Sequence, residues 1–568
     1  MFTPRQLKDI IVKGKILSEK ELALVAADAE KNKVPLQDHL MNKKIVSEDL
    51  LYSIAATVLK LPFINLRTQT IQNEILTLIP EPIATTHHLV AFKKDTTLHV
   101  ATTNPNDMET QEAIQKEIGL PLTVYCTTPT ALKDALKHYH KELTQEVREM
   151  TDTTDNDETG AAHELPMIRM VDTILEHAII EGASDIHIEP TEKELTIRFR
   201  IDGILQPAMT LPKSVQAGVV ARIKVLTNMK IDEHRLPQDG RFKIVTPQAE
   251  VSFRVSTIPV FDGEKIVMRL LHESAQILSL EQLGLLPSAL AVVKRNITKP
   301  HGQLLVTGPT GSGKTTTLYT VLNMLNNPGV NIITIEDPIE YRMPGVNQSQ
   351  VNPKIGFTFA SGLRAFLRQD PNIIMVGEIR DTETAEIAVH AALTGHLVLS
   401  TLHTNDAITT IARLIDMGVP SFLISSTLVL IVAQRLVRKI CPNCISSYTL
   451  DKKMVEELER SFAMKEIIDV MAREKAIAST KEKLESMLFY RGKGCGECHQ
   501  DGYKGRIGVY EVLEISPAMA ELILKRATRD ELALQAKKEN MVTLAQDGFI
   551  KAKNGITTIE ELIRVTKE

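Results

Sequence analysis

Residues 304–315 read Leu304-Leu305-Val306-Thr307-Gly308-Pro309-Thr310-Gly311-Ser312-Gly313-Lys314-Thr315, an apolar strand that runs into a glycine-rich loop. From Gly308 the pattern is G-x-x-x-x-G-K-T, and a helix is predicted to begin with Thr316. The glycines let successive backbone N–H groups point at phosphate oxygens, and the helix N-terminus adds a favourable dipole. Lys314 is expected to reach the β- and γ-phosphates, and Thr315 to hold Mg²⁺. A chance glycine turn has no need of the flanking strand and helix, so residues 308–316 are predicted to bind a nucleoside triphosphate.

The composition is that of a multidomain globular protein. A length of 568 residues corresponds to roughly three or four domains at ~150 residues each. The net charge of −5 gives no overall basic signature for nucleic acid. The longest apolar run, residues 422–433, is shorter than the ~20 residues that cross a bilayer, so any membrane association is expected to be peripheral. Five cysteines and no recognisable signal peptide favour the reducing cytosol.

The N-terminal third is predicted to hold two small domains. Residues 1–60 contain a weak helical repeat, in which Lys15-Ile16-Leu17-Ser18-Glu19 recurs as Lys44-Ile45-Val46-Ser47-Glu48. A serine followed by acidic residues is typical of a helix start. Residues 61–145 alternate short β-rich runs with helical ones, such as 98–101 and 108–118, which predicts a small α/β domain.

The rest of the chain is predicted to form a linker and two larger domains. Residues 149–160 lack any basic, aromatic or branched aliphatic residue, so a flexible acidic linker is expected at 146–163. A domain of helix and strands follows at 164–275. Residues 286–568 then show the β–α alternation of a largely parallel sheet covered by helices, with a charged helical insertion at 445–490.

Two strand ends carry acidic residues suited to hydrolysis. Residues 331–335 are a buried-strand pattern that ends at Glu336-Asp337-Pro338-Ile339-Glu340, and residues 373–377 are another that ends at Glu378. Ligands of an open α/β sheet bind at the carboxyl ends of strands, so these carboxylates are expected to meet the phosphates. We assign Glu378, with Thr315, to Mg²⁺ and water, Glu336 to water activation, and Glu340 as the alternative base. A helix cap or a surface charge is the plain alternative for any one of them.

Residues 394–405 carry two histidines around a predicted strand. The imidazoles of His396 and His403 could sense the γ-phosphate through hydrogen bonds and transmit its loss. From their spacing alone, histidines satisfied within the core are an equal alternative.

Four cysteines form two C-x-x-C pairs, Cys441/Cys444 and Cys495/Cys498. Four thiolates satisfy tetrahedral Zn²⁺ with no open position, which would make the site structural. The intervening segment is longer than the usual zinc-ribbon gap, so two separate redox pairs remain the alternative. Cys126 stands alone and is expected to pack as a small apolar residue.

Taken together, these motifs closely resemble those of the secretion ATPases of the type II secretion and type IV pilus class. In this family the four motifs are known as the Walker A motif, the Asp box, the Walker B motif and the His box. They match residues 308–315, 335–341, 367–381 and 394–405 of this sequence. Upstream stretches also match, namely Gly182-Ala183-Ser184-Asp185-Ile186-His187, Arg198-Phe199-Arg200-Ile201-Asp202-Gly203 and Arg235-Leu236-Pro237-Gln238-Asp239-Gly240-Arg241. The resemblance covers residues 164–568.

The resemblance implies an α/β architecture and an ATPase activity. It implies a PAS-like domain at 164–275 joined to a RecA-like P-loop domain at 286–568, assembled as a hexameric ring that uses ATP and Mg²⁺. It also implies that arginines of the first domain close over the triphosphate, and the matching positions are Arg254 and Arg269. Arg235 and Arg241 are weaker candidates, for which surface or interdomain ion pairs are an equal alternative.

The N-terminal region and the cysteines point to one branch of this family. Retraction motors lack both features, whereas the assembly branch carries the tetracysteine zinc site, which here would span 441–498. The chain is therefore expected to power assembly as a cytoplasmic protein, peripheral at the inner membrane, with a platform protein and cytoplasmic pilus-assembly proteins as partners. Its length and doubled N-terminal region favour pilus extension by pilin polymerisation, and type II secretion through pseudopilus assembly is the alternative.

The N-terminal repeat and the composition bear on regulation and on other functions. The repeat at 1–60 resembles modules that bind cyclic di-GMP, but it reads Gln6-Leu7-Lys8 and Pro35-Leu36-Gln37 where the modules carry arginine and glycine. Binding of the dinucleotide is therefore expected to be weak or lost. A nucleic-acid translocase is a remote alternative, because aromatic residues make up 4% of the chain, tryptophan is absent and the net charge is negative. A scaffold that binds ATP without turnover is a second alternative.

Overall fold

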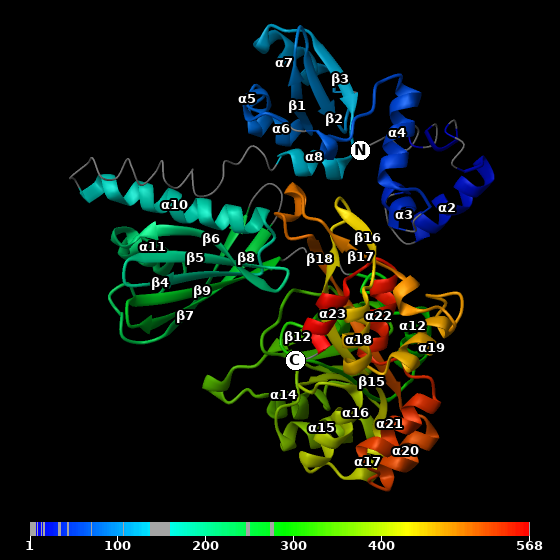
Figure 1. Cartoon of the computed structure of the whole chain (residues 1–568). Coiled ribbons are helices and arrows are strands. Elements are labelled where there is room, and N and C mark those ends of the chain that lie inside the picture. The colour runs from blue at the N-terminus through cyan, green and yellow to red at the C-terminus, as the bar shows by residue number, and fades with distance from the viewer. Residues whose placement is uncertain are drawn as a thin grey trace. The chain divides into compact units, whose positions relative to one another are not determined.

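The structure is a computed structural model in which the chain divides into two compact units, residues 1–180 and 181–568 (Figure 1). It describes the chain apart from residues 1–6, 8–9, 13, 15–16, 32–35, 43–44, 70, 106, 137–159, 246–249, 273–277 and 567–568. The linker predicted at 146–163 falls largely outside the described residues. Its last residues, 160–163, belong to the helix α10 (Gly160–Ile180), which begins before the domain predicted at 164–275.

Helices make up the first part of unit 1. They are α2 (Glu19–Lys31), α3 (Leu36–Asn42) and α4 (Glu48–Leu59), whose apolar residues share one core. The backbone N–H of Glu21 donates to Ser18 Oγ at 3.3 Å, and that of Leu50 donates to Ser47 Oγ at 3.3 Å. The two helix starts predicted from the repeated serines are thus confirmed.

A three-stranded sheet with its own core forms the second part of unit 1. Its strands are β1 (Leu89–Lys94), β2 (Leu98–Thr102) and β3 (Leu122–Cys126). Its helical segments are η1 (Leu66–Thr68), α5 (Asn73–Leu76), α6 (Glu81–His87), α7 (Met108–Ile118) and α8 (Pro129–Leu136). The small α/β domain predicted downstream of the helical repeat is present.

Unit 2 begins with a six-stranded antiparallel sheet in the order β6-β5-β4-β9-β8-β7. The strands are β4 (Asp185–Pro190), β5 (Glu194–Ile201), β6 (Ile204–Pro212), β7 (Gln238–Val245), β8 (Glu250–Val260) and β9 (Gly263–His272). Alternate residues of the central strands are buried, so the sheet has one apolar and one polar face. A short η3 (Lys213–Val215) leads into α11 (Gln216–Leu226), whose fully buried Lys224 donates to Glu264 of β9 at 2.9 Å.

A seven-stranded sheet in the order β12-β11-β13-β14-β10-β15-β18 forms the centre of unit 2. Its strands are β10 (Gly302–Thr307), β11 (Ile332–Glu336), β12 (Val346–Gln350), β13 (Ile373–Val376), β14 (Leu397–Leu402), β15 (Leu428–Ile440) and β18 (Tyr503–Glu514). Neighbours are parallel except for β15 and β18. The largely parallel sheet predicted from the β–α alternation is confirmed.

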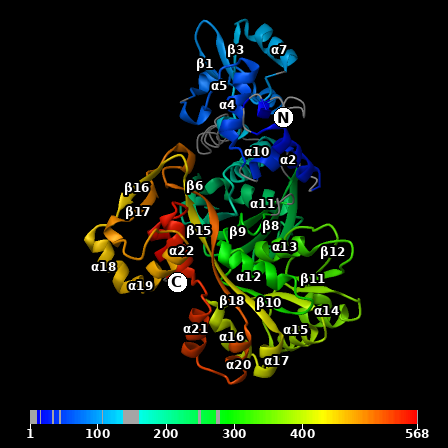
Figure 2. The same cartoon turned by 90° about the vertical axis from the view of Figure 1, so that its right-hand side faces the viewer.

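Helices cover both faces of this sheet, and each face has its own apolar core (Figure 2). One face carries α14 (Phe359–Phe366), α15 (Thr382–Leu393), α16 (Ala407–Asp416), α17 (Ser421–Thr427), α20 (Pro517–Leu524) and α21 (Arg529–Lys538). The other carries α12 (Pro287–Ile297) and α13 (Lys314–Leu325). A short η4 (Pro353–Ile355) follows β12. Strands buried on both faces explain the continuous apolar runs in the sequence.

The predicted insertion and the last helices share a further core. The insertion contains β16 (Ile445–Thr449), α18 (Lys452–Ser461), α19 (Met464–Arg473), η5 (Leu484–Ser486), β17 (Leu488–Gly492) and η6 (Gly496–Cys498). The chain closes with α22 (Leu544–Lys553) and α23 (Ile559–Thr566). Because β16 and β17 pair antiparallel, the insertion returns to the point where it left.

Candidate active site

Four parallel strands place the predicted site residues at one edge of the seven-stranded sheet. Thr307 of β10 pairs with Leu402 of β14, and Val376 of β13 pairs with Ser400 of β14. Ile335 of β11 in turn pairs with Val376. The carboxyl ends of these strands therefore align, which is where an open α/β sheet binds its ligands.

The loop after β10 has the conformation that phosphate binding needs. Gly308 and Gly313 have φ values of 148° and 87°, a region that side chains disfavour. A Cβ added to Gly308 would lie 2.4 Å from the carbonyl oxygen of Gln434, so the loop cannot accept one. Ser312 Oγ is buried and has no hydrogen-bond partner within the described structure. An unused buried hydroxyl in a glycine-rich loop fits a phosphate ligand.

Lys314 begins α13 and is enclosed by the loop. Its Nζ donates to the carbonyl oxygens of Gly308 at 2.8 Å and Pro309 at 3.0 Å. Burial lowers the pKa of Lys314 to about 8; the negative charge of Glu378 opposes this shift and the positive charge of Arg435 adds to it. The ammonium group thus lacks a full counter-charge, which a triphosphate would supply.

Glu378 and His403 meet beside this lysine. His403 Nε2 lies 3.2 Å from Glu378 Oε2, and Arg380 pairs with the other carboxylate oxygen at 2.5 Å. Glu378 lies two residues after the end of β13, at the strand end where the sequence predicts a ligand for metal and water. The sequence did not predict the contact between Arg380 and Glu378, although both residues lie in the motif at 367–381.

His396 lies at the other end of the same strand. The prediction that it senses the γ-phosphate is therefore wrong for a nucleotide bound by the same chain. It precedes Leu397, which pairs with Gly302 at the start of β10. Its Nδ1 lies 2.9 Å from the carbonyl oxygen of Ala391. The strand between the two histidines spans about 20 Å at ~3.3 Å per residue, so only His403 reaches the phosphate edge.

Glu336 and Glu340 differ in their surroundings. Glu336 is 2% exposed, and it accepts hydrogen bonds from Tyr319, from Thr334 at 2.5 Å and from Gln348 at 3.3 Å. Burial raises the pKa of Glu336, although these hydrogen bonds oppose the shift. Glu340, in contrast, is only partly buried. Sequence reasoning missed Tyr319, because nothing in the spacing shows that this helix residue ties down a strand-end acid.

The predicted arginines line the polar face of the six-stranded sheet. Arg254 of β8 pairs in register with Arg241 of β7 and with Arg269 of β9, so the three lie side by side. Burial lowers the pKa of Arg254, while the negative charges of Glu340 and Asp337 oppose this shift. This coupling indicates that the arginine face is directed at the acidic segment after β11.

Arg235 stands apart from this row. It lies on the loop before β7, its side chain is 91% exposed, and it is 3.7 Å from Glu233. Its exposure and its acidic neighbour fit the surface ion pair that the sequence analysis kept as an alternative.

The four predicted cysteines form one cluster. Their sulfur atoms all lie within 4.8 Å of one another, with Cys441 3.8 Å from Cys495 and Cys444 3.8 Å from Cys498. The backbone N–H groups of Cys495 and Gly502 each donate to Cys498 Sγ at 3.2 Å, which favours a thiolate there. Four converging sulfurs fit a tetrahedral metal ion, so the long gap between the pairs is no obstacle.

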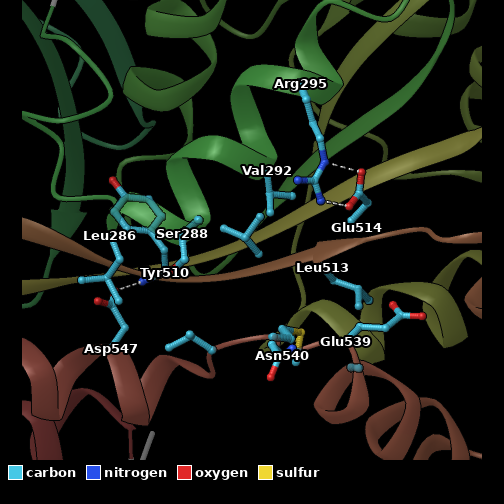
Figure 3. A pocket seen from close by; sticks show the side chains of 15 residues that line it. Leu286, Ser288, Val292, Arg295, Tyr510, Leu513, Glu514, Glu539, Asn540 and Asp547 are labelled. Carbon is cyan, nitrogen blue, oxygen red and sulfur yellow. Dashed lines mark hydrogen bonds and ion pairs between the residues drawn. The ribbon is translucent and has the colours of Figure 1, made fainter. Parts of the chain in front are cut away.

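A pocket of about 180 Å³ lies elsewhere, between α12, β18 and the last helices (Figure 3). Apolar side chains such as Val292 and Leu513 line it, and Arg295 Nε donates to Glu514 Oε1 at 2.9 Å on its wall. Its lining includes none of the residues predicted to bind phosphate or metal. This pocket is therefore separate from the edge of the sheet that carries the predicted phosphate-binding loop.

Comparisons with known proteins agree with this geometry. The family described as "Type II/IV secretion system protein" matches residues 160–564, and the MshEN domain matches residues 59–146. The type IV pilus assembly ATPase PilB of Myxococcus xanthus is 38% identical over 98% of each chain. The type II secretion system protein E of Pseudomonas aeruginosa is 47% identical over 71% of this chain and 76% of its own.

The likeness to solved structures concerns the fold. The ATPase DotB of Yersinia pseudotuberculosis has 22% sequence identity and a TM-score of 0.50, covering 72% of this chain and 94% of its own. The MshEN match covers the small α/β domain and not the repeat at 1–60, where the likeness to cyclic di-GMP modules was expected. Within the described residues, no helix has the length and apolar character to cross a membrane.

The buried Lys314 predicts a proton uptake when ATP binds. With a pKa of about 8, about half of the Lys314 side chains are neutral at pH 8 and almost all are charged at pH 6.5. The triphosphate stabilises the charged form, so we expect an uptake of about half a proton per site at pH 8 and almost none at pH 6.5. Isothermal titration calorimetry in buffers of different ionisation enthalpy measures it.

Lys314→Arg is the matched control, because arginine stays charged at both pH values. The uptake by the native chain in excess of this variant should appear only at pH 8. Equal uptake by the two proteins at pH 8 would contradict the assignment.

Proposed function

The chain belongs to the type II/IV secretion system protein family of ATPases, and we propose that it hydrolyses ATP to power the assembly of type IV pili. The observation that carries this proposal is that one chain contains both the predicted phosphate-binding edge of the sheet and an N-terminal unit that the pilus relative shares. Similarity to the Myxococcus PilB runs over 98% of the chain, whereas that to the Pseudomonas type II secretion protein covers 71%. Type II secretion by pseudopilus assembly is the second candidate, supported by the higher identity of that relative.

In this proposal residues 308–316 cradle the phosphates of ATP through their backbone N–H groups. Lys314 neutralises the β- and γ-phosphates, as its incomplete charge balance suggests. Thr315 and Glu378 would hold Mg²⁺, which when bound neutralises charge on the phosphate oxygens. His403 lies against Glu378 and is suited to report the state of that carboxylate.

We assign activation of the attacking water to Glu340 rather than to Glu336. Hydrogen-bond donors engage both oxygens of Glu336, so neither oxygen is free to accept a proton from water. Glu340 is free of such contacts in the described structure and close enough to Arg254 to influence its charge. Glu336 then acts by fixing Tyr319 and the segment after β11.

Arg254 and Arg269 would close over the γ-phosphate and stabilise charge in the transition state. Binding of ATP then favours closure of the arginine-bearing domain on the RecA-like domain, and hydrolysis releases it. We propose that this cycle runs in a homo-hexameric ring, peripheral at the inner membrane on its cytoplasmic side. An inner-membrane platform protein and cytoplasmic pilus-assembly proteins would be its partners. Any binding of cyclic di-GMP would involve residues 59–146, which match the MshEN domain, rather than the repeat at 1–60.

We also propose that Cys441, Cys444, Cys495 and Cys498 hold one structural Zn²⁺. All four ligand positions would be filled by thiolates, which leaves no site for catalysis. The ion would fasten the insertion at 445–490 to the end of β15 and the start of β18. A Cβ on Gly492 would lie 2.1 Å from the carbonyl oxygen of Gly502, so the two segments can approach this closely only with glycine at these positions.

Three acid-to-amide variants test the hydrolysis site. Glu378→Gln and Glu340→Gln should each lower kcat at least about 100-fold while ATP still binds, because each removes a charge that acts on metal or water. Glu336→Gln should lower it less than about tenfold, because the amide keeps most of the buried hydrogen bonds. Steady-state turnover and the binding of a fluorescent ATP analogue measure the two effects. The reverse ranking of Glu336→Gln and Glu340→Gln would restore Glu336 as the base.

Deletion of the gene separates the two candidate functions. We expect surface pili to disappear and exported enzymes to persist, because the motor would supply only pilin polymerisation. Native protein should restore the pili, and Lys314→Ala should not. Loss of enzyme export with intact pili would favour type II secretion. Strong stimulation of the ATPase by DNA, with none by the platform protein, would instead point to a translocase.

Removal of two thiolates tests the metal site. Cys441→Ser combined with Cys495→Ser should abolish bound zinc, because two ligands cannot retain a structural ion. Limited proteolysis should then cut the insertion at 445–490 faster. Cys126→Ser is the matched control, since this buried thiol lies in the other unit. A native chain that purifies without zinc, or a double variant that retains it, would sink the assignment.

A further inference from the structure

One acidic residue interrupts the row of arginines on the polar face of the six-stranded sheet. The in-register residues run Arg241, Arg254, Arg269, Asp185 and Arg200 across five neighbouring strands. Residues paired in this way lie on the same face with Cβ atoms about 5 Å apart. Four guanidinium groups so close together repel one another, and Asp185 is the single negative charge of the row.

Asp185 is buried between two of these arginines. It is 6% exposed, and Arg269 Nε donates to its Oδ1 at 3.0 Å. On the other side Arg200 Nε lies 3.5 Å from its Oδ2, which also accepts from Ser184 Oγ at 2.9 Å. The carboxylate is therefore held from both sides and has a fixed direction.

This contact uses only one edge of the Arg269 guanidinium. The bond to Asp185 is made through Nε, and the side chain is 56% exposed. A guanidinium has five N–H groups in a rigid plane, so fixing Nε also fixes the direction of Nη1 and Nη2. Those two nitrogens have no hydrogen-bond partner among the described residues, and together they match two oxygens of one phosphate.

The charges near Arg254, the in-register neighbour of Arg269, indicate which segment lies close to this side of the sheet. Arg254 makes no ion pair within the described part of the chain, and it is electrostatically coupled to Glu340 and Asp337 after β11. Arg269 lies next to it in register. Arg269 therefore lies one strand away from an arginine that interacts with the segment that we assign to the attacking water.

We propose that Asp185 is a positioning residue, which holds Arg269 by Nε so that its two terminal nitrogens meet the γ-phosphate when the domains close. The inference rests on the proposed function, since it takes ATP as the ligand of the phosphate edge. Asp185 also lowers the electrostatic cost of gathering the arginines before ATP arrives. It touches no substrate itself and acts through Arg269.

The test is a double-mutant cycle on the full-length protein. Asp185→Asn should lower kcat for ATP about tenfold or more, because an untethered Arg269 is misplaced in the transition state. The KM for ATP should change less than about threefold, since the loop and Lys314 are untouched. In an Arg269→Ala background the same substitution should have no further effect. A purely structural role would lower the rate by the same factor in both backgrounds.

Glu189 provides a matched control on the same face. It pairs with Arg198 at 2.7 Å and with Lys265 at 2.8 Å, so Glu189→Gln also breaks a carboxylate held by two cations. This variant should keep the native kcat. Thermal unfolding of each variant shows whether it is folded.

A second variant, Arg269→Lys, changes the other residue of the Asp185–Arg269 pair. This test does not depend on whether an Asp185 variant folds. Lysine keeps the charge but cannot bind Asp185 and two phosphate oxygens together, so turnover should fall about tenfold or more. Native turnover in Asp185→Asn or in Arg269→Lys, or an undiminished effect of Asp185→Asn in the Arg269→Ala background, would overturn the proposal. Absence of ATP turnover in the native chain would instead overturn the proposed function.

Discussion

The parallel pairing of β10, β11, β13 and β14 is the constraint on which the site depends. Because these strands run in one direction and in register, the segment that follows each of them emerges at the same edge. The phosphate loop, the acidic segment, Glu378 and His403 come from distant parts of the chain but share that edge. The same pairing carries His396 to the opposite edge, although only six residues separate the two histidines.

Incomplete charge balance is the second organising feature. Lys314 is enclosed by carbonyl oxygens and receives only partial compensation from Glu378. On the neighbouring domain Arg254 lacks an ion-pair partner within the described structure, and Asp185 contacts only Arg269 and Arg200 of the other arginines in the row. A triphosphate would complete the charge balance on both sides at once. Such a link between binding and domain closure would suit the motor that we propose, because the ligand would interact more strongly with the closed arrangement.

Two carboxylates on one short segment also show that position at a strand end does not define a role. Glu336 belongs to the buried strand, where Tyr319, Thr334 and Gln348 consume its hydrogen-bonding capacity. Glu340 lies beyond the strand, where burial is partial and a second domain is near. The difference arises from the helix that supplies Tyr319 and from the strands that supply Thr334 and Gln348.

Local patterns determined the elements of this protein and the identity of its phosphate loop. These patterns act over only a few residues, so they can be predicted directly from the sequence. They include glycines that adopt positive φ, apolar runs buried on both faces, and serines that cap helices. The tertiary structure alone decided which of these pieces meet. It separated His396 from His403, distinguished Glu336 from Glu340, and joined the distant cysteine pairs through the ribbon of β16 and β17. It also placed Asp185 between Arg200 and Arg269. Each of these outcomes depends on strand register and packing between segments far apart in the chain, and no local spacing encodes them.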